Sequence, residues 1–254
     1  MIVVTGGAGF IGSNVVAALT AKGDREVVIC DVFGNSDKWL NVSKHELAGV
    51  ISPPDLLDFL NSESFRMEAI IHLGAVTDTT ETDVDLILRT NVWLSIELMD
   101  WCTAHQVPFI YASSAQVYGD GALGFDDDPT QEAMADLRTI TPYGASKLLF
   151  DRLVARERDA GRPLPPQWAG LRFFNVYGPH EGHNGDMRSV IAKTFPALQA
   201  GEAMRLFHSD RPEYGDGGQM RDFIFVRDCA DVVLWLLDHP DVSGIYNLGT
   251  GQAR

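Results

Sequence analysis

The chain has 254 residues, of which 45% are hydrophobic, and its 35 acidic against 20 basic residues give a formal net charge of −15. This length can bury a sizeable core and lies near the upper limit for a single one. The negative charge argues against a nucleic-acid surface, which needs clustered Lys and Arg, and no apolar run approaches the roughly 18 residues of a membrane span.

The chain begins with a predicted strand at residues 2–4, so we expect no signal peptide. The glycine segment TGGAGFIG, residues 5–12, follows this strand, and a predicted helix over residues 11–22 ends near Gly23. Glycines between a strand and a helix are typical of a loop that binds the phosphates of a dinucleotide.

Three glycines of this loop have separate expected roles. We expect Gly6 to permit the tight turn, Gly9 to let the backbone approach the pyrophosphate, and Gly12 to allow close packing of the helix on the sheet. The N-terminus of the helix then faces the phosphates with its N–H groups and its positive dipole end.

A second apolar strand, residues 27–30, ends at Asp31. This position lies about 20 residues beyond the loop, where a carboxylate accepts hydrogen bonds from the adenosine ribose. Asp31 alone favours NAD because it would repel a 2′-phosphate, whereas Lys38 would neutralise such a phosphate. These residues leave both NAD and NADP open.

Strands and helices continue to alternate through the middle of the chain. Predicted strands cover residues 69–73, 109–112 and 171–174, and predicted helices cover 84–105 and 143–158. Continuous apolar strands that alternate with helices indicate a parallel sheet covered on both faces. We therefore predict an α/β fold with a Rossmann-type, doubly wound parallel sheet.

The composition changes after Gly178. We expect a loop at 210–218, strands at 221–226 and 245–248, and a helix over 228–237. The predicted division is a dinucleotide-binding domain over residues 1–174 and a smaller substrate-binding lobe over 175–254, interleaved with the end of the sheet. The final turn, residues 249–254, would normally lead into a further element, so we expect the chain to be truncated there.

The three cysteines are widely spaced, and they form neither a disulfide framework nor a metal-binding motif. Cys30 and Cys229 lie in apolar stretches, where we interpret them as core thiols, and Cys102 lies in a helical stretch. The pattern is typical of a cytoplasmic protein without a metal site.

Three residues form a candidate catalytic set. Tyr143 and Lys147 are four residues apart in a predicted helix, which places a phenol and an ammonium on one face. A nearby ammonium favours the phenolate, so we expect Lys147 to bring Tyr143 closer to acting as a general base near neutral pH. Ser114 follows a strand at the carboxyl edge of the sheet, where its hydroxyl can orient a substrate oxygen.

Two arginines suggest different roles. Arg221 begins a predicted strand after a flexible loop, and its guanidinium suits a diphosphate by bidentate contact. A surface ion pair with Asp222 or Asp228 is the alternative. Arg172 lies within an apolar strand, where we expect a buried ion pair.

With these motifs in place, the whole chain resembles the extended short-chain dehydrogenase/reductase superfamily, which modifies nucleotide-linked sugars. The resemblance is carried by TGGAGFIGSN, the helix of Asn91, YASSAQVYG, YGASK, RFFNVYGP and MRDFIFVRD. Within the superfamily, FNVYGPHEGHNGDMRSV, LFHSD and VSGIYNLGTGQAR are most similar to the ADP-L-glycero-D-manno-heptose 6-epimerases, which supply the heptose of bacterial lipopolysaccharide.

This resemblance implies site residues, a cofactor and a substrate class. The implied catalytic residues are Ser114, Tyr143 and Lys147. The cofactor, NADP in that family with NAD as the other possibility, would be lined by Gly6, Gly9, Phe10, Ile11, Gly12, Asp31, Val32, Lys38, Leu73, Gly74, Ala75, Asn91, Tyr143, Lys147 and Val176. A nucleotide-diphosphate sugar would be bound by Ser114, Asn175, His183, Asn184, Asp186, Lys193, Leu206, Phe207 and Arg221. A homo-oligomer is also implied, and binding to nucleic acid or membrane is not.

The chain departs from the family pattern at two places. Asn184 stands where the family carries a lysine as second base, and an asparagine cannot take or give a proton. His183, ahead of its neighbours His180 and Glu181, is a candidate replacement, because imidazole titrates near neutrality; hydrogen bonding to substrate or loop is the alternative. Pro53 stands where the family has a lysine near the adenosine phosphate, which weakens the prediction of NADP.

Two other functions remain open on the sequence. A UDP-sugar 4-epimerase would use the same tyrosine and lysine but would rotate the whole sugar. A non-catalytic NAD(P)-binding sensor or scaffold would not need an activated phenol. A dehydratase is disfavoured, because that branch needs an Asp-Glu pair where this chain has Ala115 and Gln116.

Overall fold

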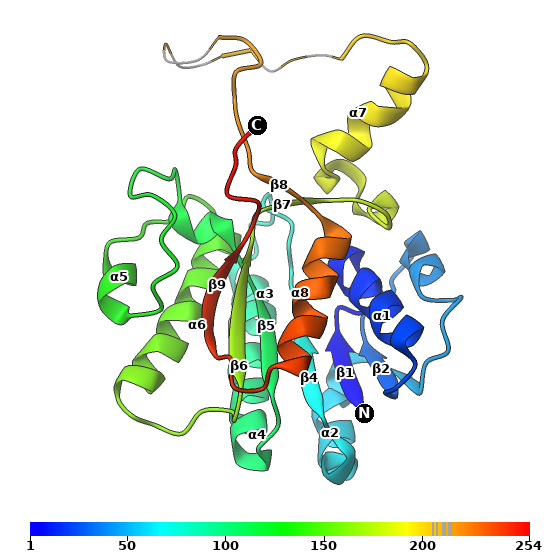
Figure 1. The fold of residues 1–254 in the computed structure, drawn as a ribbon, viewed down its shortest axis with the longest axis vertical. Coiled ribbons are helices and arrows are strands. Elements are labelled where there is room, and N and C mark those ends of the chain that lie inside the picture. Colours follow the sequence, from blue (N-terminus) through cyan, green and yellow to red (C-terminus); the bar gives the residue numbers. More distant parts are fainter. Residues whose placement is uncertain (205, 207, 210–211, 213–214) are drawn as a thin grey trace.

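In the computed structural model, residues 1–204, 206, 208–209, 212 and 215–254 are described. The main sheet has seven strands in the order β3-β2-β1-β4-β5-β6-β9, and every neighbouring pair is parallel (Figure 1). The predicted doubly wound parallel sheet is therefore confirmed. Two further strands, β7 and β8, pair in parallel above it.

The bounds of the elements are as follows. The strands are β1 (Ile2–Thr5), β2 (Val27–Cys30), β3 (Gly49–Ile51), β4 (Ala69–His72), β5 (Phe109–Ser114), β6 (Trp168–Phe173), β7 (Asn175–Tyr177), β8 (Phe223–Phe225) and β9 (Gly244–Leu248). The helices are α1 (Phe10–Lys22), α2 (Leu56–Ser62), α3 (Val84–Leu88), α4 (Leu94–His105), α5 (Gln131–Ala135), α6 (Pro142–Asp159), α7 (Val190–Gln199) and α8 (Val226–Asp238). A π-helical turn, Arg89–Trp93, joins α3 to α4.

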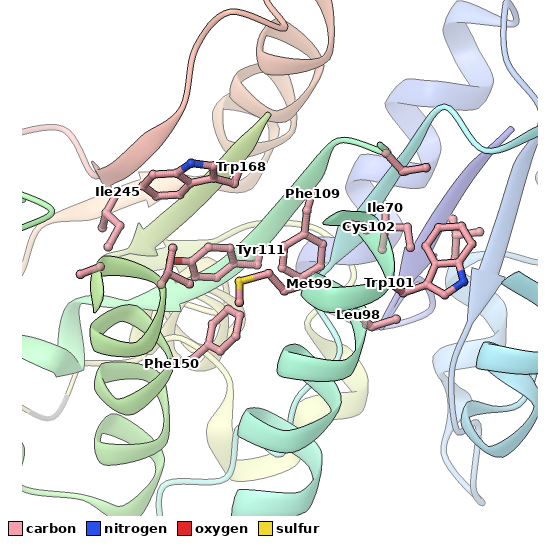
Figure 2. Close-up of a cluster of buried hydrophobic side chains, with 14 of the residues drawn as sticks. Ile70, Leu98, Met99, Trp101, Cys102, Phe109, Tyr111, Phe150, Trp168 and Ile245 are labelled. Atoms are coloured by element: carbon pink, nitrogen blue, oxygen red, sulfur yellow. The ribbon is translucent and has the colours of Figure 1, made fainter. Parts of the chain in front are cut away.

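The sheet is hydrophobic on both faces because its strands alternate their side chains between two helical layers. On one face, Ile2 and Val4 pack with residues of α1 and α8. On the other, Val3 belongs to a cluster formed with α2, α4 and α6. Figure 2 shows the centre of that second cluster, where Phe109 and Tyr111 of β5 meet helices α4 and α6.

Several elements differ from the sequence predictions. The expected helix over 84–105 is interrupted by the π-helical turn, and the strand expected at 171–174 runs from Trp168 to Phe173. The strand expected at 221–226 covers Phe223–Phe225, because α8 already begins at Val226. Elements β3, β7, α2, α5 and α7 were not predicted. Residues 210, 211, 213 and 214 of the expected loop lie outside the described residues.

The cysteine and arginine predictions can be compared directly with the structure. Cys30 and Cys229 are buried free thiols, which confirms their interpretation as core residues, and Cys102 is a buried free thiol as well. Arg172 pairs with Asp151 at 2.9 Å with both side chains fully buried, so the predicted buried ion pair is confirmed. None of the helices in the described part of the chain is both long and apolar enough to cross a membrane.

The parallel arrangement fixes where a site can form. All carboxyl ends of the main strands meet at one edge, and loops that follow β1, β2, β4, β5 and β6 gather there. Strand β9 returns to the sheet beside β6 after the segment that carries β7, α7 and β8. The proposed boundary between a domain and a lobe near residue 174 stays a prediction.

Candidate active site

A cavity of about 1220 Å³ lies at the carboxyl edge of the sheet. It exceeds the roughly 300–1,000 Å³ of a pocket for one small ligand, so it has room for more than one. The predicted site residues that line it are Gly6, Gly9, Phe10, Ile11, Gly12, Asp31, Lys38, Leu73, Gly74, Ala75, Ser114, Tyr143, Lys147, Asn175, Val176, His183, Asn184, Leu206 and Arg221.

Other predicted residues lie elsewhere. Val32, Asp186 and Lys193 are exposed and are not among the described residues that line the cavity. Asn91 is buried beneath it, and Phe207 lies outside the described residues. Sequence reasoning missed Thr77, Thr79, Met187, Arg188 and Gln219, which also line the cavity and carry no motif that marks them.

The glycine loop is packed too tightly for side chains. Gly6 has φ +67°, and a Cβ there would lie 2.7 Å from the amide nitrogen of Gly74. A Cβ on Gly12 would lie 2.1 Å from the carbonyl oxygen of Gly6. The tight turn predicted at Gly6 is therefore confirmed. Gly12 lets α1 pack closely on the glycine loop, and its predicted role in packing the helix on the sheet stays a prediction. Gly9 caps α1 in an extended conformation, and its role toward a pyrophosphate stays a prediction.

Asp31 fastens the glycine loop to the end of β2. Its carboxylate accepts hydrogen bonds from the backbone N–H of Ala8 at 2.8 Å and of Val32 at 2.7 Å. The ammonium of Lys38 donates to the same carboxylate at 2.6 Å. Three donors thus already engage the group that was expected to bind the ribose.

His183 lies on the β2 side of the cavity. Its Nδ1 is 3.3 Å from the side-chain nitrogen of Asn41, which also donates to the carbonyl of Ala8 at 3.0 Å. Burial lowers the pKa of His183, with Lys38 contributing and Asp31 opposing.

This location separates His183 from the catalytic set. Asp31 follows β2 and Ser114 ends β5, three strand spacings away across the sheet, or roughly 14 Å. Because His183 shares its surroundings with Asp31 and Lys38, the geometry favours a role toward the adenosine end of a dinucleotide. The hypothesis that His183 is a second acid gains no support.

The catalytic residues are brought together by α6 and β5. Thr141 caps the helix by accepting a hydrogen bond from the N–H of Gly144 at 3.0 Å, and Pro142 occupies its first turn. A Cβ on Gly144 would lie 3.0 Å from the carbonyl of Gln116, so this glycine lets α6 approach the segment after Ser114. Tyr143 and the Ser114 hydroxyl are hydrogen-bonded partners.

Burial dominates the acidity of these groups. It raises the pKa of Tyr143 to about 12, against a smaller lowering by the Ser114 hydrogen bond. It also lowers the pKa of Lys147 to about 8, and Asp151 opposes that fall. The Lys147 ammonium lies 5.9 Å from the centre of the Tyr143 ring. The pKa of Tyr143 is therefore raised, in the direction opposite to the one expected from its neighbouring lysine, because desolvation is the largest contribution.

Asn91 supports the cavity from below. Its carbonyl oxygen accepts from the N–H of Val76 at 2.8 Å, and its amide donates to the Val76 carbonyl at 2.9 Å and to Ser146 at 3.0 Å. Ser146 in turn donates to the carbonyl of Tyr143 at 2.7 Å. Asn91 therefore joins the loop after β4 to the catalytic helix, rather than lining the cavity as predicted.

The wall of the cavity opposite the sheet edge is formed by the segment between β7 and α7, and Glu181 holds this segment in place. This buried carboxylate accepts from the N–H of Gly178 at 2.8 Å and from the N–H and hydroxyl of Ser189 at 2.6 and 3.0 Å. The same Ser189 hydroxyl caps α7 by accepting from the N–H of Ala192 at 3.1 Å. One carboxylate thus holds the segment between β7 and α7 in a closed turn.

Arg221 lines the cavity and is held through its backbone. Its N–H and carbonyl pair with the carbonyl and N–H of Arg254 at 3.0 and 2.9 Å. Asp222 instead accepts hydrogen bonds from Thr250 and Gly251. The Arg221 guanidinium donates to the carbonyl of Met220 at 2.7 Å, and within the described residues no ion pair joins it to Asp222 or Asp228.

Comparison with known proteins places this geometry in context. The model of the NAD dependent epimerase/dehydratase family matches residues 2–249. A relative from Nitratidesulfovibrio vulgaris, named ADP-L-glycero-D-manno-heptose-6-epimerase, is 44% identical over all of this chain and 77% of its own length. The Helicobacter pylori structure of that name superposes with a TM-score of 0.79 at 28% identity, again over all of this chain and 77% of the other. Thermus thermophilus UDP-glucose 4-epimerase, in complex with NAD, has a TM-score of 0.72 at 27% identity, over all of this chain and 78% of its own.

Proposed function

The chain belongs to the NAD dependent epimerase/dehydratase family, and we propose that it interconverts the two C6 epimers of an ADP-linked heptose. The observation that carries this proposal is the 44% identity, over the whole chain, with a relative named for that reaction. The hydrogen-bonded Ser114 and Tyr143 at the sheet edge, with Lys147 one turn along α6, support chemistry at a carbinol carbon.

The residues present fit a dinucleotide cofactor. A side chain at Gly6 or Gly12 would overlap with backbone atoms nearby, so the tight loop needs glycine at both positions. The N-terminus of α1 faces the cavity, where its N–H groups can bind phosphates. When bound, such a cofactor accepts a hydride from the carbinol carbon and returns it to the other face of the resulting ketone. Leu73, Gly74 and Ala75, after β4, line the cavity between this loop and the catalytic helix.

Proton transfer falls to the catalytic set. The Ser114 hydroxyl holds the reacting oxygen, and Tyr143 exchanges the proton with it. With a pKa of about 12, Tyr143 carries its proton at neutral pH, which suits it to protonate the oxygen when the hydride returns. To take the proton in the first half, the phenol must lose its own, and the Lys147 ammonium beside it favours that state.

Epimerisation at C6 needs the ketone to show its second face. Rotation about one carbon–carbon bond achieves this, but it moves the oxygen away from Tyr143. Asn184, which lines the cavity, can hold the moved oxygen by donating a hydrogen bond but cannot supply a proton. We expect Asn184→Lys, which restores a titratable group, to raise turnover about tenfold or more. An Asn184→Gln control should leave turnover low, and equal rates in both variants would contradict this account.

We further propose NADP as the preferred cofactor. The Asp31 carboxylate is engaged by Ala8, Val32 and Lys38, which leaves it less able to receive two ribose hydroxyls. Lys38 and His183 offer positive charge and a ring N–H on the same side of the cavity. A 2′-phosphate is an anion with several acceptors, and such a pair suits it.

The reaction is tested with separate substrates. Incubation of the protein and NADP with ADP-D-glycero-D-manno-heptose should give the L-glycero epimer, read from proton NMR couplings. Conversion of UDP-galactose alone would favour a UDP-sugar 4-epimerase instead. Unchanged configuration in both substrates would favour a non-catalytic binding protein.

The cofactor preference is tested by binding. Dissociation constants for NADP and NAD should differ at least tenfold in favour of NADP, and Lys38→Met should remove most of that difference. Lys22→Met is the control, because Lys22 pairs with Asp238 at the far end of α1. Equal affinities in the unaltered protein would overturn the NADP proposal and leave the epimerase proposal standing.

A further inference from the structure

A buried carboxylate outside the cavity connects the catalytic elements. Asp151 lies on α6 four residues after Lys147 and eight after Tyr143, so the three share a helix face. It is fully buried and is not among the described residues that line the cavity. Its carboxylate accepts hydrogen bonds from Ser113 at 2.9 Å, from Arg172 at 2.9 Å and from Tyr111 at 3.3 Å.

Each of these partners lies next to a part of the site. Ser113 precedes Ser114 on β5, and Arg172 precedes Phe173 of β6, which lines the cavity. Arg172 reaches further, because it donates to the Tyr118 hydroxyl at 2.8 Å. One carboxylate thereby joins the helix of Tyr143 to both strands that form the floor beneath it.

The Tyr118 hydroxyl extends the network to the last strand of the sheet. It donates to the side-chain oxygen of Asn247 in β9 at 2.7 Å. The backbone N–H of Asn247 donates to Asp127 at 2.7 Å. The catalytic helix is therefore connected to β5, β6 and β9 through fully or partly buried polar groups.

The charge of Asp151 also matters to Lys147. Lys147 is 4% exposed, and no ion pair holds its ammonium within the described part of the chain. The titratable groups near it are His72 of β4 and, on its own helix, Tyr143 and Asp151. Burial lowers the pKa of His72 to about 3 and raises the pKa of Tyr143 to about 12, so both side chains are neutral near pH 7. Asp151 is then the negative group that opposes the loss of the Lys147 proton.

We propose that Asp151 is a positioning residue for the reaction: it fixes α6 on β5 and β6 and supplies the buried negative charge that keeps Lys147 an ammonium. This inference rests on the proposed function for its catalytic meaning. The two structural effects proposed for Asp151 are to fix the position of α6 and to keep Lys147 protonated. Neither effect depends on the identity of the sugar. Arg172 forms the ion pair with Asp151 and offsets its negative charge, so removing Arg172 is expected to raise the pKa of Lys147.

The test measures the titration of Lys147 through stability, without turnover. A lysine whose pKa is near 8 in the folded chain and about 10.4 in the unfolded chain makes stability rise as pH increases between those values. Urea unfolding from pH 6 to 10.5, with and without Lys147→Met, isolates that rise. In Asp151→Asn, the pH at which this rise in stability begins should fall by about one unit. In Arg172→Gln, the same pH should increase.

Controls and activity separate the possible outcomes. Asp159→Asn makes the same change at the exposed end of α6 and should leave that pH unchanged. If Asp151→Asn does not fold, the direction of the shift in Arg172→Gln decides alone. If the pH at which stability begins to rise is the same in every variant that folds, the proposal is overturned.

Turnover provides the second readout. If the protein epimerises ADP-heptose, the pH at which turnover declines on the alkaline side should shift in each variant. The shift should have the same direction as that of the pH at which stability begins to rise. A lower rate at every pH, with no shift of the alkaline decline, would reduce Asp151 to a merely structural residue. Absence of turnover in the unaltered protein would contradict the proposed function and leave the stability test valid.

Discussion

The two walls of the cavity are built differently. The sheet wall carries Ser114, Tyr143 and Lys147 on elements joined by the buried groups of Asn91 and Asp151. The opposite wall is formed by the segment after β7 and by α7, which has no buried residue in the described structure. Figure 1 shows α7 standing away from the sheet, beyond β7 and β8.

This difference assigns the catalytic steps to the sheet wall and the recognition of the substrate to the opposite wall. Groups that move protons must be held within a fraction of an ångström, and the sheet wall provides this through partners inside the core. A wall held by few buried contacts is lower in local stability and can adapt to a sugar nucleotide. We therefore expect substitutions on the sheet wall to change turnover, and substitutions on the opposite wall to change substrate affinity.

The largest effect is expected at Tyr143. Tyr143→Phe removes the exchanged proton while keeping the ring, and turnover should fall by about 10³-fold or more. Cofactor affinity should stay within about twofold, because the ring still fills its place. Stopped assays with ADP-heptose and binding titrations with NADP measure the two effects. Full activity in this variant would remove the phenol from the mechanism.

The next effect concerns the glycine loop. In Gly12→Ala, a new Cβ would lie 2.1 Å from the carbonyl oxygen of Gly6, so backbone must shift. Such overpacking typically costs about 1–3 kcal/mol, which corresponds to a cofactor affinity roughly 5- to 150-fold weaker. Gly182→Ala, where a Cβ meets open space, is the matched control on the opposite wall. Equal affinities in the two variants would contradict the tight packing of α1 on its loop.

An intermediate effect is expected from pH. Burial lowers the pKa of Lys147 to about 8, so the ammonium is present below that pH and is lost above it. Turnover should therefore fall as pH rises through about 8, approaching a tenfold loss for each further unit. Lys147→Arg stays charged throughout and should show no such decline, although its rate is expected to be lower. A profile that stays flat to pH 10 in the unaltered protein would show that the Lys147 charge is not required.

The two walls also differ in how well the sequence predicted them. The strands that hold Asp31 and Ser114 are continuous apolar runs, and the glycine loop between β1 and α1 has a specific pattern, so both were located from sequence alone. The acidity of Tyr143 was predicted in the wrong direction, because sequence spacing shows the neighbouring lysine but not the extent of burial. Asn91 was placed in the cofactor lining, whereas its contacts with Val76 and Ser146 depend on a π-helical turn that no pattern marks.

The opposite wall depended on tertiary contacts that leave little trace in sequence. His183 was predicted to be an acid or base because imidazole titrates near neutral pH. Its position beside Asn41 and Lys38 results from the tertiary fold. Helix α7 was missed because Pro196 lies inside it, a residue that usually signals a helix end. Such features follow from the fold as a whole, and sequence spacing carries no signal for them.

The smallest predicted effect tests the adaptable wall itself. Glu181→Gln keeps the shape of the side chain but replaces one acceptor oxygen with an NH₂ group that faces the donors of Gly178 and Ser189. Loss of one such charge-assisted bond, worth about 1.5 kcal/mol, should loosen the turn before α7 and raise KM for the sugar nucleotide about tenfold. Turnover at saturation should change by less than about twofold, because Ser114, Tyr143 and Lys147 lie on the other wall. Glu202→Gln, an exposed change just beyond α7, should alter neither constant. If Glu181→Gln instead lowers kcat with KM unchanged, the two walls act together, and chemistry and selection are not separate in this protein.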